Sequence, residues 1–146
     1  MQLGSIKWKN LIDNGAKALD VNIDQVKKEQ FVIHALELVK WNRKINLTAI
    51  TDPFEIAVKH FLVSIAPAPF IPSHALLLDI GSGGGFPGIP LKILMPSLSV
   101  TLIEASRKKV SFLKHVIRTL KLENIEALNI RAEDLVKAGY FANYYD

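Results

Sequence analysis

The residues best suited to chemistry lie in a glycine-rich segment, residues 79–88, in which Asp79 precedes glycines at positions 81, 83, 84, 85 and 88. An apolar run, 75–80, leads into it, and an apolar stretch with helical spacing follows. In an open α/β sheet, ligands bind at the carboxyl ends of strands, and glycine lets the backbone turn tightly and approach the ligand because it has no Cβ. The segment therefore predicts a loop that binds a small molecule.

Two cofactor classes use such loops. A dinucleotide fingerprint, GxGxxG, that begins at Gly81 would place the large ring of Phe86 where the third glycine is needed for close packing. The same pattern matches two residues later, but further from the strand and with Pro87, which has no N–H, where a phosphate would bind. The acidic-x-GxGxG turn of methyltransferases, which bind S-adenosylmethionine, fits without a shift. The residues that make this match are Asp79, Gly81, Gly83 and Gly85.

Polar residues also follow the next two apolar runs. Glu104 comes after residues 99–103, where a carboxylate can accept hydrogen bonds from both hydroxyls of a ribose, in NAD as well as in S-adenosylmethionine. Ala132 and Glu133 come after residues 125–130, from which a backbone N–H and a polar side chain could reach an adenine edge. Each residue alone is equally typical of a helix start. Together they predict three cofactor contacts at three strand ends.

Hydrophobic periodicity predicts the elements that position these groups. Apolar strands alternate with helices in βαβαβ order, which implies a parallel sheet with right-handed crossovers. The continuous apolar run 75–78 predicts that the first strand is buried on both faces. The expected strands are 75–80, 99–103 and 125–130, and the expected helices are 89–95 and 106–122.

The first 72 residues have a different pattern and predict a helical region that precedes residues 73–146. A first helix is expected over 5–19. A second is expected to begin after Asn22 or Asp24 and to end near Asn46. A third should begin at Pro53, with Thr51 or Asp52 as its cap, and stop before the prolines at 67, 69 and 72.

Composition excludes several classes of protein. The 146 residues contain no cysteine, which excludes disulfides and thiolate metal sites and fits a cytoplasmic location; we expect no metal. With 49% hydrophobic and 22% charged residues the chain is not disordered, and no apolar run reaches the length of a membrane span. A net charge of +4 is compatible with a nucleic-acid partner.

Several stretches resemble the small-subunit (16S) ribosomal RNA methyltransferase G family, also called glucose-inhibited division protein B. The string at 85–91 and the Trp-Asn and Asn-Leu-Thr block at 41–48 are typical of that family rather than of methyltransferases in general. The matching stretches cover most of the chain: 41–50, 59–62, 79–91, 102–104 with 108–109 and 112–113, and 122–125 with 131–133.

The resemblance implies a Rossmann-like S-adenosylmethionine-dependent methyltransferase fold with an N-terminal helical extension. It implies methyl transfer to N7 of a guanine in small-subunit ribosomal RNA. By the resemblance, Gly81, Phe86, Ala132 and Glu133 would contact the cofactor, with Glu104 at the ribose. Guanine N7 has an exposed lone pair and no proton, so the transfer needs positioning rather than a general base, and we expect no catalytic side chain.

The chain departs from the family pattern at three places. Val63 stands where an aspartate is usual, and Gly84 where alanine or proline is usual. The chain stops at Asp146, within what looks like the start of a fourth strand. We therefore expect an incomplete sheet whose first strand has an open edge, association through that edge, and no methyl transfer by this chain alone. There are two alternative functions. The chain could be an inactive fragment that binds cofactor or RNA, or it could be an NAD-dependent oxidoreductase.

Two basic clusters could contact RNA phosphates. Lys108 and Lys109 lie on the helix 106–122, which has no acidic residue, and Arg43 and Lys44 follow Trp41. Basic helix faces are often only solvated, and a tryptophan in this setting is more often a core anchor than a platform for a base. If the clusters do bind RNA, phosphate contacts would position it without reading its sequence.

Overall fold

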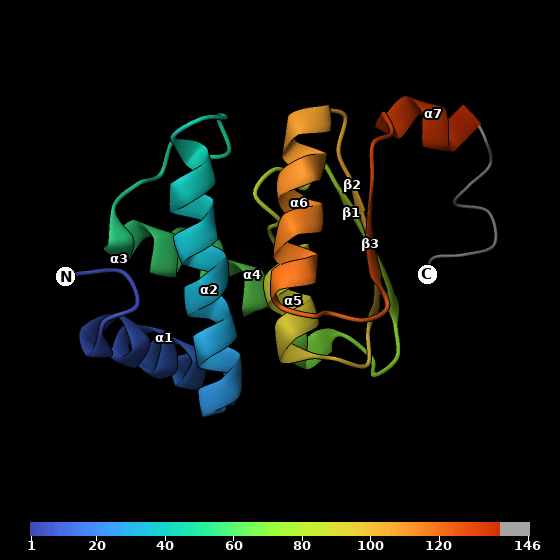
Figure 1. Cartoon of the computed structure of the whole chain (residues 1–146). Helices are drawn as coiled ribbons and strands as arrows, with labels where there is room; N and C mark the ends of the chain where they lie inside the picture. The colour runs from blue at the N-terminus through green and yellow to red at the C-terminus, as the bar shows by residue number, and fades with distance from the viewer. Residues whose placement is uncertain (138–146) are drawn as a thin grey trace.

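The computed structural model describes residues 1–137, which form the predicted helical region followed by a βαβαβ unit (Figure 1). The helical region contains α1 (Ile6–Ala18), α2 (Gln25–Asn42), and one continuous helical segment made of α3 (Pro53–Glu55), the π-helix η1 (Ile56–Leu62) and α4 (Val63–Ile65). After the 3₁₀ turn η2 (Ala68–Phe70) come β1 (Leu76–Ile80), α5 (Gly88–Leu94), β2 (Ser99–Ile103), α6 (Arg107–Thr119), β3 (Ile125–Leu128) and α7 (Ala132–Lys137).

The three strands form a parallel sheet in the order β1-β2-β3, as the alternating pattern predicts. Ile80 is level with Ile103, and Ile103 with Leu128, so all three strands end at one edge. Both crossovers step in the same direction across the sheet, and right-handed connections therefore place α5 and α6 on the same face (Figure 1). Residues that follow the strands are thus brought together at one edge.

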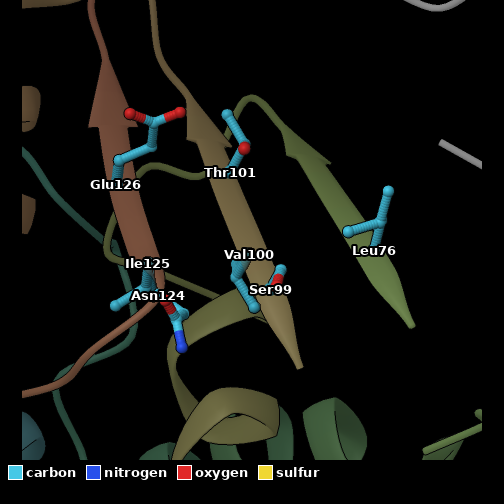
Figure 2. A pocket seen from close by; sticks show the side chains of 7 residues that line it. All are labelled: Leu76, Ser99, Val100, Thr101, Asn124, Ile125 and Glu126. Carbon is cyan, nitrogen blue, oxygen red and sulfur yellow. The ribbon is translucent and has the colours of Figure 1, made fainter. Parts of the chain in front are cut away.

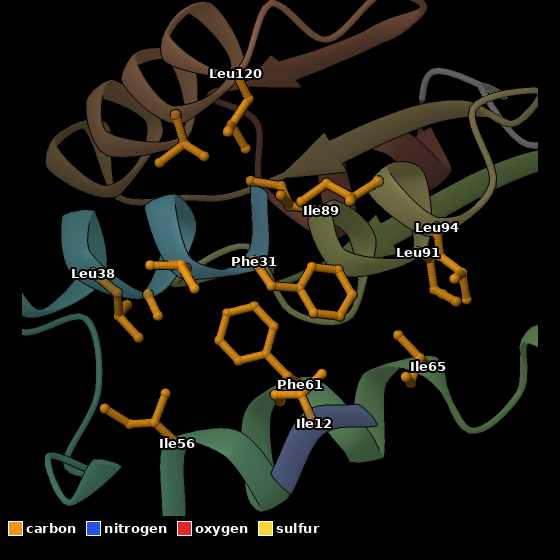
Figure 3. Packing of buried hydrophobic residues seen from close by; sticks show 14 of the residues in the cluster. Ile12, Phe31, Leu38, Ile56, Phe61, Ile65, Ile89, Leu91, Leu94 and Leu120 are labelled. Atoms are coloured by element: carbon orange, nitrogen blue, oxygen red, sulfur yellow. The ribbon is translucent and has the colours of Figure 1, made fainter. Parts of the chain in front are cut away.

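The helical region packs against α5 and α6 through a shared hydrophobic cluster. Trp8 on α1 is fully buried and donates its indole N–H to the carbonyl of Pro53 at 2.9 Å. The rings of Phe31 and Phe61 lie 5.1 Å apart at its centre (Figure 3). The same cluster includes Ile89 of α5, so the core is continuous from α1 to the crossover helices. This shared core fixes the glycine-rich turn relative to the helical region.

Three expectations need correction. Helix α2 ends at Asn42 rather than near Asn46, because the Asn42 side chain instead bonds the backbone that follows. Strand β1 is not buried on both faces: Leu76 is 42% and Ile80 50% exposed, because their side chains point away from the face on which α5 and α6 pack. The third helical segment contains a π-helix that its sequence did not predict.

The helices and strands of the βαβαβ unit otherwise begin and end within a few residues of their predicted limits. The expected fourth strand, at 144–146, lies outside the described residues. No helix within residues 1–137 is both long and apolar enough to span a membrane.

Candidate functional site

The glycine-rich turn leaves β1 and folds back across the end of β2. The N–H groups of Gly81 and Ser82 both donate to the carbonyl of Ile103, at 2.8 and 3.1 Å. Three glycines of the turn have positive φ: 72° at Gly81, 54° at Gly83 and 95° at Gly85. Residues with a Cβ adopt this left-handed backbone conformation only at an energetic cost, so the turn favours glycine at these positions.

The first half of the turn, residues 81–83, borders open space. A Cβ added at Gly81 would meet no described atom within 4 Å, and one added at Gly83 would meet only the carbonyl oxygen of Gly81, at 4.0 Å. This is the backbone that a ligand at the carboxyl edge could approach most closely. We call residues 81–83 the open half.

The second half, residues 84–88, is packed into the core. An added Cβ would lie 2.8 Å from Leu38 at Gly84, 2.6 Å from Ile89 at Gly85, and 2.4 Å from Leu102 at Gly88. These glycines are buried, and they allow α5 to approach β2 and α2 closely. We call residues 84–88 the packed half.

Asp79, the acidic residue of the motif, holds the packed half. Its carboxylate accepts a hydrogen bond from the N–H of Gly88 at 3.0 Å, and its own carbonyl accepts one from the hydroxyl of Ser82. Burial raises the pKa of Asp79 to about 6, although the bond from Gly88 favours the charged form. The side chain is therefore engaged inside the protein and is 7% exposed.

Glu104 ties the open half to α6. Its two carboxylate oxygens accept hydrogen bonds from the N–H of Gly83 at 3.1 Å and from the N–H of Ser106 at 2.7 Å. A carboxylate has about four acceptor positions, so lone pairs remain for two further donors. Gly83 and Glu104, each predicted to contact the cofactor, are thus brought into direct contact with each other, an arrangement suited to a ligand with paired hydroxyls.

The end of β3 contributes a residue that the sequence did not single out. The amide of Asn129 donates to the carbonyls of Glu104 and Ala105, at 3.1 and 2.9 Å, and so fixes the end of β3 against the end of β2. Ala132 and Glu133 begin α7 just beyond it. Glu133 is exposed, and its carboxylate lies 3.9 Å from the guanidinium of Arg131.

Phe86 does not point towards the open half. Its ring is stacked between two imidazoles, with centroids 4.7 Å from His34 and 4.4 Å from His60, and it meets Phe61 edge-on. His34 Nε2 donates to the carbonyl of Gly84 at 2.8 Å, which fixes its tautomer. The ring of Phe86 therefore anchors the packed half to the helical region.

Burial keeps the imidazole of His34 neutral. It lowers the pKa of His34 to about 4, since the charged form would lose its hydration, and the remaining ring nitrogen, Nδ1, has no hydrogen-bond partner among the described residues. Burial also lowers the pKa of His60. Two neutral rings can pack on Phe86 without placing charge in the core.

The Trp-Asn and Asn-Leu-Thr block of the sequence supports the same stack. The Asn42 side chain accepts from the N–H groups of Leu47 and Thr48 and donates to the carbonyl of Thr48. The hydroxyl of Thr48 then lies 2.8 Å from Nε2 of His60. His60 is thus a hydrogen-bonded structural residue, and residues far apart in sequence share one network. Their separation along the chain is why the sequence alone did not show it.

Three of the four predicted RNA-contact residues lie around one hollow. Lys44, two residues after the end of α2, lines this hollow together with Lys108 and Lys109 at the start of α6. Arg43 is exposed beside them but does not line the hollow. The structure therefore joins the two basic clusters that are separate in sequence.

A larger hollow on the other face of the sheet lies away from this edge (Figure 2). It is built around the first residues of the strands rather than the last ones. Its lining consists of Leu76, Ser99, Val100, Thr101, Asn124, Ile125 and Glu126. Position therefore excludes it as the site formed by the glycine-rich turn. Within residues 1–137, no group of three His, Asp or Glu side chains is arranged to hold a metal ion.

Sequence comparisons identify similar proteins. The family model described as rRNA small subunit methyltransferase G matches residues 27–143. A protein of Syntrophus aciditrophicus named ribosomal RNA small subunit methyltransferase G is 46% identical over 96% of this chain and 59% of its own length. One of the same name from Geotalea uraniireducens is 47% identical over 91% of this chain and 62% of its own length. The chain thus spans about six tenths of the curated relatives it matches.

A structural comparison supports the fold. A putative protein-L-isoaspartate O-methyltransferase from Plasmodium falciparum, solved in complex with S-adenosyl-L-homocysteine, matches 87% of this chain and 64% of its own, with a TM-score of 0.52. At 18% sequence identity, this likeness concerns the arrangement of helices and strands alone.

Proposed function

The chain belongs to the rRNA small subunit methyltransferase G family, and from that premise we propose that it binds S-adenosylmethionine and serves the methylation of small-subunit ribosomal RNA. The observation that carries the proposal is the contact between Glu104 and the N–H of Gly83 beside open space at the carboxyl edge. Ligands of open α/β sheets bind at this edge.

The residues present fit this cofactor. Gly81 and Gly83 leave the space that a Cβ would fill, which suits the close passage of the amino-acid part of the ligand. Glu104 keeps free lone pairs for the ribose hydroxyls. We propose that Ala132 and Glu133 lie at the adenine, and that Phe86 contributes through its backbone since its ring is held by His34 and His60. We propose that Asp79 supports the site indirectly: its carboxylate accepts a hydrogen bond from the N–H of Gly88 and so fixes the turn.

We propose N7 of a guanine in 16S ribosomal RNA as the acceptor. When bound, the cofactor supplies an electrophilic methyl group on a sulfonium. Guanine N7 carries no proton, so this chain's residues need only orient the base and exclude water. His34 and His60 are both held in structural hydrogen bonds, which is compatible with a transfer that needs no general base. We also propose a cytoplasmic location, because the proposed substrate is ribosomal RNA.

A thermal-shift comparison tests the cofactor. S-adenosylhomocysteine, at about 100 times its Kd, should stabilise the protein by about 2.7 kcal/mol through ligand linkage, whereas NAD should not raise the melting temperature. The acidic-x-GxGxG match and the engaged ring of Phe86 are the reasons for this difference. Stabilisation by NAD but not by S-adenosylhomocysteine would overturn the proposal in favour of an oxidoreductase.

A further inference from the structure

We propose that the junction between the end of α2 and the start of α6 binds a single-stranded segment of RNA, with one base against Trp41 and neighbouring phosphates on Lys44, Lys108 and Lys109. The inference rests on the proposed function and assigns a surface to its RNA substrate. We call this surface the α2/α6 groove; Lys40, Trp41, Lys44, His115, Asn46, Ser106, Lys108 and Lys109 line it.

Positive charge at the groove has no matching carboxylates. The ion pairs of Lys9, Lys17, Lys28 and Lys59 all lie elsewhere in the helical region. Among residues 1–137, none of the groove's lysines forms an ion pair, and α6 contains no acidic residue. Two carboxylates border the groove, and both are already engaged: Glu37 accepts a hydrogen bond from His115 at 2.9 Å, and Glu104 accepts from the N–H groups of Gly83 and Ser106. Uncompensated lysines on two elements form a potential that attracts phosphates.

Trp41 supplies an aromatic surface beside these charges. It is partly exposed, and it rests on α6 with its ring centroid 5.6 Å from Phe112 and 5.2 Å from His115. Its remaining surface lines a hollow of about 280 Å³ with Lys40 and Lys44. Every base has a π face that can stack on such a ring without a fixed sequence.

Lys44 belongs to both hollows and joins the aromatic part of the groove to the basic part. A nucleotide combines a flat apolar base with an anionic phosphate on a short linker, so one strand of RNA can satisfy both parts at once. An acidic peptide would match the lysines but would leave Trp41 unused. The pairing of surfaces therefore favours RNA over an acidic protein.

The groove also lies next to the proposed cofactor edge. Ser106 lines the groove, and its N–H is bonded to Glu104, which in turn accepts from Gly83 of the open half. RNA held in the groove would thus place a neighbouring nucleotide beside the methyl donor. A site that positions substrate next to the reacting group is what a transfer without a general base requires.

Tryptophan fluorescence tests the base contact, because the chain has only two tryptophans. Trp8 is fully buried, whereas Trp41 lines the groove. A mixed-sequence single-stranded RNA 10-mer should quench the emission of the full chain, and the variant Trp41→Phe should bind RNA with its remaining emission unchanged. Polyphosphate should bind without quenching. RNA binding that leaves the wild-type emission unchanged, or that quenches Trp41→Phe equally, would overturn the base contact.

The salt dependence of RNA affinity tests the phosphate contacts. For single strands, each lost phosphate contact lowers the slope of log K against log salt by about 0.7, so the triple change of Lys44, Lys108 and Lys109 to Gln should lower it by about 2. The control changes Lys7, Lys17 and Lys27 to Gln, which alters net charge equally but lies on α1 and the start of α2. Equal losses in both variants would overturn the site.

Cofactor binding separates this inference from the proposed function. Both triple variants should bind S-adenosylhomocysteine as the unchanged chain does, because none of the six lysines contacts the turn. RNA binding that fails while S-adenosylhomocysteine still binds would reject the groove and keep the proposed cofactor. Failure of S-adenosylhomocysteine binding would reject the proposed function. The RNA measurements would then still decide whether the groove binds RNA.

Discussion

The two halves of the glycine-rich turn contain the same residue type for different physical reasons. In the open half, Gly81 and Gly83 have positive φ and border space in which a Cβ would meet almost nothing. In the packed half, the glycines are buried, and a Cβ at Gly85 or Gly88 would penetrate its neighbours. The comparison teaches that the first glycines keep room for a ligand, whereas the later ones let α5 approach the sheet.

Each half is also held by a different carboxylate. Glu104 accepts from Gly83 in the open half and connects it to the strand edge. Asp79 accepts from Gly88 in the packed half and connects it to the core. Changes to one half should therefore affect ligand binding, and changes to the other should affect stability.

The largest expected effect on stability is that of Gly85→Ala. The change combines a residue at φ 95° with a methyl group 2.6 Å from Ile89, and should lower the free energy of unfolding by about 3 kcal/mol and the melting temperature by about 10 °C. The matched control is Gly81→Ala, which also has positive φ but meets no described atom, and should cost only about 1–2 kcal/mol. Thermal unfolding followed by circular dichroism measures both. Equal losses would show that packing does not distinguish the halves.

A second test uses pH, because two groups that hold the packed half should respond oppositely to acid. The folded-state pKa of His34, about 4, lies below its ordinary 6.5, so its contribution to stability is complete above pH 6.5 and is lost as pH falls towards 4. The folded-state pKa of Asp79, about 6, lies above its ordinary 3.8, so the cost of its charged form is present above pH 6 and is relieved as pH falls towards 4. Each change amounts to up to about 3 kcal/mol.

Single variants should reveal these opposing contributions. Asp79→Asn should make the protein lose about 2 kcal/mol more than the unchanged chain between pH 7 and 4.5, whereas His34→Gln should make it lose less. Urea unfolding at the two pH values measures the difference. Two variants with the same acid response would contradict the opposite roles of these groups.

The smallest effect is expected from Glu104→Gln. The N–H groups of Gly83 and Ser106 bind different carboxylate oxygens, and glutamine replaces one of these oxygens with an NH₂ donor. The open half should therefore loosen, and cofactor affinity should fall about tenfold, or about 1.4 kcal/mol. Calorimetric titration with S-adenosylhomocysteine measures it. Glu126→Gln, an exposed change on β3, is the control and should have no effect. Unchanged affinity in Glu104→Gln would remove this carboxylate from the site.

Local sequence signals were sufficient for the positions of the elements. Asp24 and Asp52 cap α2 and α3 with their side chains, and Pro53 opens α3, as their residue types predicted. The strand Ser99–Ile103 has its predicted limits. These features depend on hydrogen bonds and apolar spacing within a few residues, which a single sequence displays.

Features that depend on distant neighbours could not be predicted in the same way. Nothing near Phe86 in sequence shows that His34 and His60 cover its two faces. Burial of β1 was overestimated because an apolar run does not reveal whether both of its faces are covered by other elements. The sequence placed glycines at the turn, but only packing distinguishes the open half from the packed half.

The binding of S-adenosylhomocysteine to Gly83→Val tests the central claim most directly. A β-branched side chain at φ 54° would fill the open half, so isothermal calorimetry should detect no binding, while Gly88→Ala should lower stability but leave the Kd of the folded protein unchanged. Circular dichroism on the same samples confirms that Gly83→Val is folded at the titration temperature. Wild-type affinity in folded Gly83→Val would contradict the assignment of residues 81–83 to the ligand.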